Sequence, residues 1–161
     1  MNKQNPTTLS KKAIDNVFLP THSFNGSEKD IEEYILENIH QIAKECGWGD
    51  IQRVETQYTI KCPLKEFKQR RIRLDIFIWH KDGSGTIIEV KSIKKGYRTD
   101  ALSAVSQSLH YGYVIENMLG CLPRLVIAAN EISGEIYDTI KRFNLPICLL
   151  MVDGDRCVYL R

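Results

Sequence analysis

Two carboxylates and a lysine interrupt segments of the sequence that are otherwise apolar and strand-like. Asp75 lies within Leu-Asp-Ile-Phe-Ile, and Glu89 lies within Ile-Ile-Glu-Val-Lys, two residues before Lys91. A carboxylate in such a segment is costly to bury unless it is paired or binds a cation. Because side chains alternate along a strand, Glu89 and Lys91 leave the same face. These three groups could therefore hold a divalent cation and position a water molecule.

A hairpin would bring the two carboxylates together. Asp82 and Gly83 form a typical turn pair between the two strand-like segments. Two neighbouring carboxylates make a hard, oxygen-rich site that suits Mg²⁺ or Mn²⁺. Such an ion stabilises charge on a phosphate during hydrolysis. Taken singly, however, Asp75 and Glu89 are more readily explained as structural ion pairs to Arg73 or Lys91.

The elements that must position these groups follow from periodicity and from breaks in it. Residues 1–26 are read as an N-terminal arm or lead-in, and residues 27–161 as one α/β domain. Ser27 is a plausible helix N-cap, and Gly47 ends that helix. The remaining expected elements are strands at 54–60, 72–79 and 86–91, a helix at 101–119, a strand at 125–129, a helix around 136–143, and two strands within 147–161. This order predicts a mixed sheet with helices on both faces.

Two finer expectations concern which residues share a face. Alternation along the strand at 72–79 places Ile72, Leu74, Ile76 and Ile78 on one side. In the helix at 101–119, the apolar stripe is predicted to comprise Leu102, Val105 and Leu109. Gln107 and Tyr111 stand four residues apart on a face away from that stripe.

The pattern of an aspartate, a hairpin and then Glu-x-Lys resembles the D-(x)n-E-x-K motif of the PD-(D/E)xK nuclease superfamily. The expected order of elements is similar to the αβββαβ core of the restriction-endonuclease-like fold. The following helix carries Gln107-Ser-Leu-His-Tyr111, which is similar to the QxxxY motif of RecB-like members. The resemblance covers residues 28–129, and it departs from the full motif because Leu74 replaces the proline before Asp75.

The resemblance implies hydrolysis of phosphodiester bonds and assigns the metal ligands. Asp75, Glu89 and the carbonyl of Val90 would bind Mg²⁺ or Mn²⁺. Lys91 would position the attacking water and offset charge on the phosphate. Products would carry a 5′-phosphate.

Three further residues receive roles from the same resemblance. Glu28 would hold a water molecule or a second ion, with Glu32 as the second choice, although Glu28 is also a favourable charge at a helix start. Gln107 would orient Lys91 or the water. Tyr111 would brace the pocket or contact substrate, and packing alone would also explain it.

Basic residues flank the candidate site on both sides. Arg71 and Arg73 precede Asp75, and Lys94, Lys95 and Arg98 follow Lys91. Such clusters attract phosphate backbones largely without sequence preference, although solvated charged loops look the same in sequence. The net charge of +2 is too small to identify a nucleic-acid binder by itself.

The sequence therefore predicts a metal-dependent deoxyribonuclease, structure-directed or weakly sequence-specific, acting in repair, recombination or defence. The first alternative is a catalytically silent nucleic-acid-binding or assembly module on the same fold, and an RNA-directed relative is a weaker one. A homodimer would pair two sites for two strands. Five cysteines without a C-x-x-C pair favour free thiols over a zinc site, and the absence of a long apolar run favours a cytoplasmic protein without membrane contact.

Overall fold

The computed structural model describes residues 11–14, 24–62, 71–93, 99–154 and 157–161. In chain order, its helices and strands are β1 (Lys11–Ala13), α1 (Glu28–Glu37), α2 (Ile39–Cys46), β2 (Ile51–Lys61), β3 (Arg71–His80), β4 (Gly85–Lys91), α3 (Thr99–Leu119), β5 (Arg124–Ala129), α4 (Gly134–Arg142), β6 (Ile147–Val152) and β7 (Cys157–Leu160). None of the described helices is long and apolar enough to cross a membrane.

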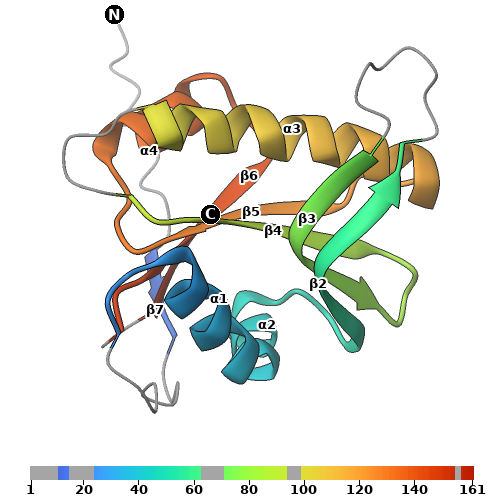
Figure 1. Cartoon of the computed structure of the whole chain (residues 1–161), viewed down its shortest axis with the longest axis horizontal. Coiled ribbons are helices and arrows are strands. Elements are labelled where there is room, and N and C mark those ends of the chain that lie inside the picture. The colour runs from blue at the N-terminus through green and yellow to red at the C-terminus, as the bar shows by residue number, and fades with distance from the viewer. Residues whose placement is uncertain (1–10, 15–23, 63–70, 94–98, 155–156) are drawn as a thin grey trace, which may run out of the picture.

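The described strands form one seven-stranded sheet in the order β1-β7-β6-β5-β4-β3-β2. The three central strands β4, β5 and β6 run parallel, while β2, β3 and β4 form an antiparallel meander. Figure 1 shows α3 and α4 on one face of the sheet and α1 and α2 on the other. The predicted fold class, a mixed sheet flanked by helices with a restriction-endonuclease-like αβββαβ core, is thereby confirmed.

The hydrophobic core has two halves, one on each face of the sheet. On β5, Leu125 and Ile127 pack in the half beneath α3 and α4, whereas Val126 and Ala128 pack in the half against α1 and α2. Both faces of β5 are therefore covered, which explains why its sequence is apolar throughout rather than alternating. Two free cysteines, Cys62 and Cys157, are buried within the core.

The single helix expected from Ser27 to Gly47 is wrong, because the structure breaks it at Asn38. Asn38 has φ −111° and ψ 10°, and α2 begins at the next residue. Its side-chain Nδ2 donates a hydrogen bond of 2.9 Å to the carbonyl of Tyr34. Asparagine competes in this way for backbone groups that a continuous helix would use. The predicted end at Gly47 is confirmed by its left-handed φ of 67°.

The N-terminal lead-in contributes to the sheet. Strand β1 pairs antiparallel with β7, and Ile14 directly after it is buried in the core half against α1. The division of the chain between residues 26 and 27 stays a prediction.

Candidate active site

The side-chain alternation of β3 changes phase at Asp75. Ile72 and Leu74 pack in the core half beneath α3, whereas Ile76 and Ile78 pack in the half against α1. The expectation that these four residues share one face is therefore wrong. The side chains of the paired strand β2 change core halves at the same level as those of β3. Asp75 lies between the two parts of β3 whose side chains enter different halves of the core.

The shift has a local cause in the backbone. Gln57 of β2 adopts a left-handed φ of 49°, and the regular pairing of β2 with β3 is interrupted between it and Asp75. The pairing of β3 with β4 covers only Ile76 to Trp79, so β3 leaves β4 at Asp75. The carboxylate Oδ2 of Asp75 then accepts a hydrogen bond of 2.9 Å from the main-chain N–H of Val90. Asp75 thus provides a hydrogen-bond acceptor for the N–H of Val90 where the strand pairing of β3 with β4 has ended.

Glu89 and Lys91 lie beside this carboxylate on the same strand face. Their side chains form an ion pair with 2.8 Å between Lys91 Nζ and Glu89 Oε1, and Glu89 is only 2% exposed. Burial and the charge of Asp75 raise the pKa of Glu89, and Lys91 opposes that shift. Burial alone would lower the pKa of Lys91, but its bond to Glu89 outweighs this and raises it. The three predicted groups are therefore close enough to act on one another.

The helix α3 adds Gln107 and Tyr111 to the site. Burial and the charge of Glu89 raise the pKa of Tyr111, while a hydrogen bond with Gln107 opposes the shift. Tyr111 is 8% exposed and belongs to the core, whereas Leu102 is 44% exposed. The predicted apolar stripe of this helix is thus wrong at Leu102, and Tyr111 lies on the buried face. This burial favours a bracing role for Tyr111 over contact with DNA.

Two acidic side chains approach from α1 on the other face. Ser27 caps this helix, and its Oγ accepts a bond of 3.1 Å from the N–H of Asp30. The charge of Glu28, which is exposed, acts on Glu89 and Lys91. Glu32 faces the other carboxylate: burial raises its pKa, and so does the charge of Asp75. The two candidate accessory acids therefore act electrostatically on different parts of the site, Glu28 on Glu89 and Lys91, and Glu32 on Asp75.

Three residues near the site were not found from the sequence. Gln57 donates from Nε2 to Oε2 of Glu32 at 3.1 Å, and Ser92 donates from Oγ to the carbonyl of Gly26 at 2.6 Å. Asn130 bonds to both the N–H and the carbonyl of Ile93, at 2.7 and 3.1 Å. The bonds of Ser92 and Asn130 hold the chain just beyond Lys91, whereas that of Gln57 joins β2 to α1. Of the three, only Asn130 could have been found from the sequence, because it is a polar residue at the carboxyl end of a buried parallel strand.

The donor set fits a divalent cation through two carboxylates and the main chain. In the described part of the chain, no group of three or more His, Cys, Asp or Glu side chains lies close enough to hold a metal. The pair Asp75 and Glu89 nevertheless brings two repelling carboxylates together, one of them almost fully buried. A hard cation would relieve that repulsion, with the carbonyl of Val90 and water as further oxygen ligands. The residues present therefore fit Mg²⁺ or Mn²⁺.

The predicted DNA-contacting residues fall into two groups. Arg71 and Arg73 are exposed near the start of β3, in the part of the strand that extends beyond its pairing with β4. Lys94, Lys95 and Arg98 lie outside the described residues.

The fold is a mixed α/β sheet flanked by helices, with a restriction-endonuclease-like core. Neither a protein-family model nor a curated protein matches the chain. Among solved structures, it is similar to the crystal structure of a repair endonuclease from Pyrococcus abyssi, with a TM-score of 0.53 and 16% sequence identity. The match covers 83% of this chain and 50% of that chain, so the present chain spans about half the length of that protein.

Proposed function

We propose that this protein is a Mg²⁺- or Mn²⁺-dependent deoxyribonuclease of the PD-(D/E)xK type. The observation that carries the proposal is the convergence of Asp75, Glu89 and Lys91 where β3 separates from β4. The similarity of the fold to that of a repair endonuclease supports the same conclusion. DNA is the proposed substrate, while a cytoplasmic location and pairing of two copies stay predictions.

The roles of the residues follow from their positions. A divalent ion held by Asp75, Glu89 and the Val90 carbonyl would polarise the phosphate and offset its developing charge. Lys91 has three N–H donors, of which Glu89 engages one, so it can also hold the attacking water against a phosphate oxygen. The hydrogen-bonded pair of Gln107 and Tyr111 would restrict Glu89 and Lys91 from the α3 side, because the charges of both act on Tyr111.

Two further charged groups would complete the site. Glu28 would accept a hydrogen bond from a water molecule near Glu89 and Lys91, because its charge acts on both. Arg73 is exposed on the same strand as Asp75 and lies within electrostatic reach of Glu32. It would attract the phosphate backbone without reading sequence.

A cleavage panel tests the proposal. Duplex, single-stranded, branched and supercoiled DNA are incubated with the full chain in Mg²⁺, in Mn²⁺ and in EDTA, with a matched RNA set beside them. We expect DNA cleavage that requires the metal and leaves 5′-phosphate ends. Metal-independent cleavage, or cleavage of RNA alone, would replace the proposal with an RNA-directed one. DNA binding without cleavage or metal binding would favour the silent binding module.

A further inference from the structure

A cavity lies at the opposite end of the sheet from Asp75, Glu89 and Lys91. It has a volume of about 430 Å³, within the range of small-molecule sites. Its lining includes the first residues of β4 and β5, and these two strands run in parallel toward Lys91 and Ala129. At about 3.3 Å per residue, the four steps along β4 from Gly85 to Glu89 and the six to Lys91 separate the two sites by roughly 13–20 Å. The cavity is therefore distinct from the candidate active site.

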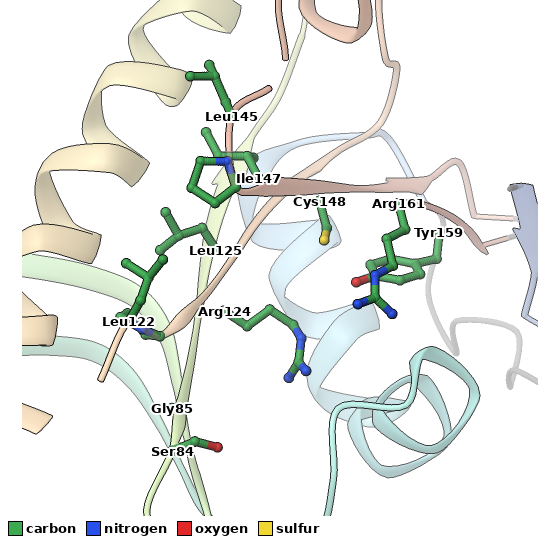
Figure 2. A pocket seen from close by; sticks show the side chains of 12 residues that line it. Ser84, Gly85, Leu122, Arg124, Leu125, Leu145, Ile147, Cys148, Tyr159 and Arg161 are labelled. Atoms are coloured by element: carbon green, nitrogen blue, oxygen red, sulfur yellow. The ribbon is translucent and has the colours of Figure 1, made fainter. Parts of the chain in front are cut away.

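The cavity has a polar side and an apolar side. Figure 2 shows Arg124, Cys148, Tyr159 and Arg161 on one side, with the two guanidinium groups extending into the same end of the cavity. The apolar wall opposite comprises Leu122, Pro123, Leu125, Leu145, Pro146 and Ile147. A ligand that fits both sides has an anionic part and an apolar part.

Arg124 is held in place by neutral groups and retains free donors. Its Nη1 donates to the carbonyl of Trp48 at 3.2 Å and to Oγ1 of Thr86 at 3.3 Å. A guanidinium group has five N–H donors in a rigid fork, so those on Nε and Nη2 stay available to a ligand. The contacts on Nη1 fix the orientation of the fork, which lowers the entropy lost on binding.

The positive charge of the cavity is not neutralised within the described residues. Its lining includes no Asp or Glu, and no described carboxylate forms an ion pair with Arg124 or Arg161. Two guanidinium groups that face one cavity repel each other until an anion lies between them. Phosphate is an anion that the forked donors of arginine bind through two parallel hydrogen bonds, as they also bind a carboxylate.

We propose that this cavity binds a nucleoside monophosphate, with the phosphate between Arg124 and Arg161 and the base against the proline- and leucine-lined wall. The nucleotide is either free or the terminal nucleotide of a DNA strand, since both present the same phosphate and base. The proposal rests on this cavity alone and does not depend on the activity proposed for Asp75, Glu89 and Lys91.

Calorimetric titration of the full chain with dAMP in EDTA tests the proposal, because no cleavage can then occur. We expect dAMP to bind more tightly than either inorganic phosphate or deoxyadenosine. Arg161→Ala and Arg124→Lys should each weaken binding at least about tenfold, since each removes charge-assisted hydrogen bonds. The control Arg142→Ala removes an exposed arginine of α4 outside the cavity and should bind as the wild type does.

The two sources of the nucleotide are separated by competition. A short oligonucleotide with a 5′-phosphate that displaces dAMP, while its 5′-hydroxyl form does not, identifies a strand end as the ligand. Displacement by free nucleotides alone identifies the free ligand. The proposal is overturned if dAMP does not bind at millimolar concentration, if it binds no better than phosphate, or if the Arg161→Ala protein binds it like the wild type. Arg161 is exposed, so its replacement leaves the fold intact.

Discussion

Replacing Lys91 by methionine tests whether its ammonium group neutralises Glu89 in the folded protein. The side chain of Glu89 is 3% exposed and that of Lys91 is 18% exposed, with 2.8 Å between the charged atoms. Removing one partner of a buried ion pair leaves an uncompensated charge and costs about 3–5 kcal/mol. The partial exposure of Lys91 places the expected loss for Lys91→Met at the lower end, about 3 kcal/mol.

The matched changes at Glu89 have different expected effects. Glu89→Gln removes the buried charge and its repulsion with Asp75, and keeps a neutral hydrogen-bonding group, so we expect a change within about 1 kcal/mol. The double variant Glu89→Gln/Lys91→Met carries no unpaired charge and should also lie within about 1 kcal/mol of the wild type. The two sites should therefore show a coupling energy of about 2–3 kcal/mol.

Urea unfolding at pH 7 in EDTA measures all four proteins, because urea leaves charge interactions unscreened. If Lys91→Met lowered the free energy of unfolding by less than about 1 kcal/mol, or if the losses simply added in the double variant, Lys91 would not be neutralising Glu89. Lys91 would then be a solvated side chain rather than the counter-charge of Glu89.

Three further predictions concern the elements around the site. Gly112→Ala in α3 would place a Cβ 2.9 Å from Leu125 Cδ2 and should lower the free energy of unfolding by about 1–2 kcal/mol. Gly134→Ala, whose new Cβ would have nothing within 4 Å, should raise the free energy of unfolding by about 0.5 kcal/mol. Equal effects of the two changes in urea unfolding would contradict this prediction. Burial lowers the pKa of His80 below its usual value of about 6.5, so the unfolded chain binds a proton at a higher pH than the folded protein does. The free energy of unfolding should therefore decrease as the pH is lowered below about 6.5, by at most about 1.4 kcal/mol per pH unit. His80→Gln should flatten the pH dependence between about 6.5 and 5.5, and an unchanged slope would assign it to another group. Ser27→Ala removes the N-cap bond of α1 and should cost about 1 kcal/mol, while Ser27→Thr should cost less, as compared by thermal unfolding.

Local signals in the sequence were sufficient for the order of the elements from β2 to β7, but not for β1 or for the division of the first helix into α1 and α2. The cap at Ser27, the left-handed glycine at Gly47 and the apolar run that forms β5 each report a backbone or burial requirement of their own segment. The break at Asn38 was missed because isoleucines at helical spacing continue on both sides of it. The interruption is visible only in the structure, in the φ of −111° at Asn38 and in the bond from its side chain to the carbonyl of Tyr34.

The residues that meet at the site could be predicted from the sequence, but the geometry that brings them together could not. Asp75 stood out because a carboxylate in an apolar strand needs a partner. The sequence could not show that the strand faces exchange there, because the exchange depends on the backbone of Gln57 in a different strand and on the separation of β3 from β4. The burial of Tyr111 likewise depends on how closely α3 approaches the sheet, which helical periodicity does not report.

The most direct test of the account is single-turnover DNA cleavage in Mg²⁺ by Asp75→Asn, Glu89→Gln and Lys91→Met, each checked for folding. We expect the rate of DNA cleavage to fall at least about 1,000-fold in each variant, which is equivalent to about 4 kcal/mol in activation free energy. Glu116→Gln, which changes an exposed acid of α3, should cleave as the wild type does. Cleavage at the wild-type rate by any of the three folded variants would contradict the claim that these groups form a metal-dependent phosphodiesterase site.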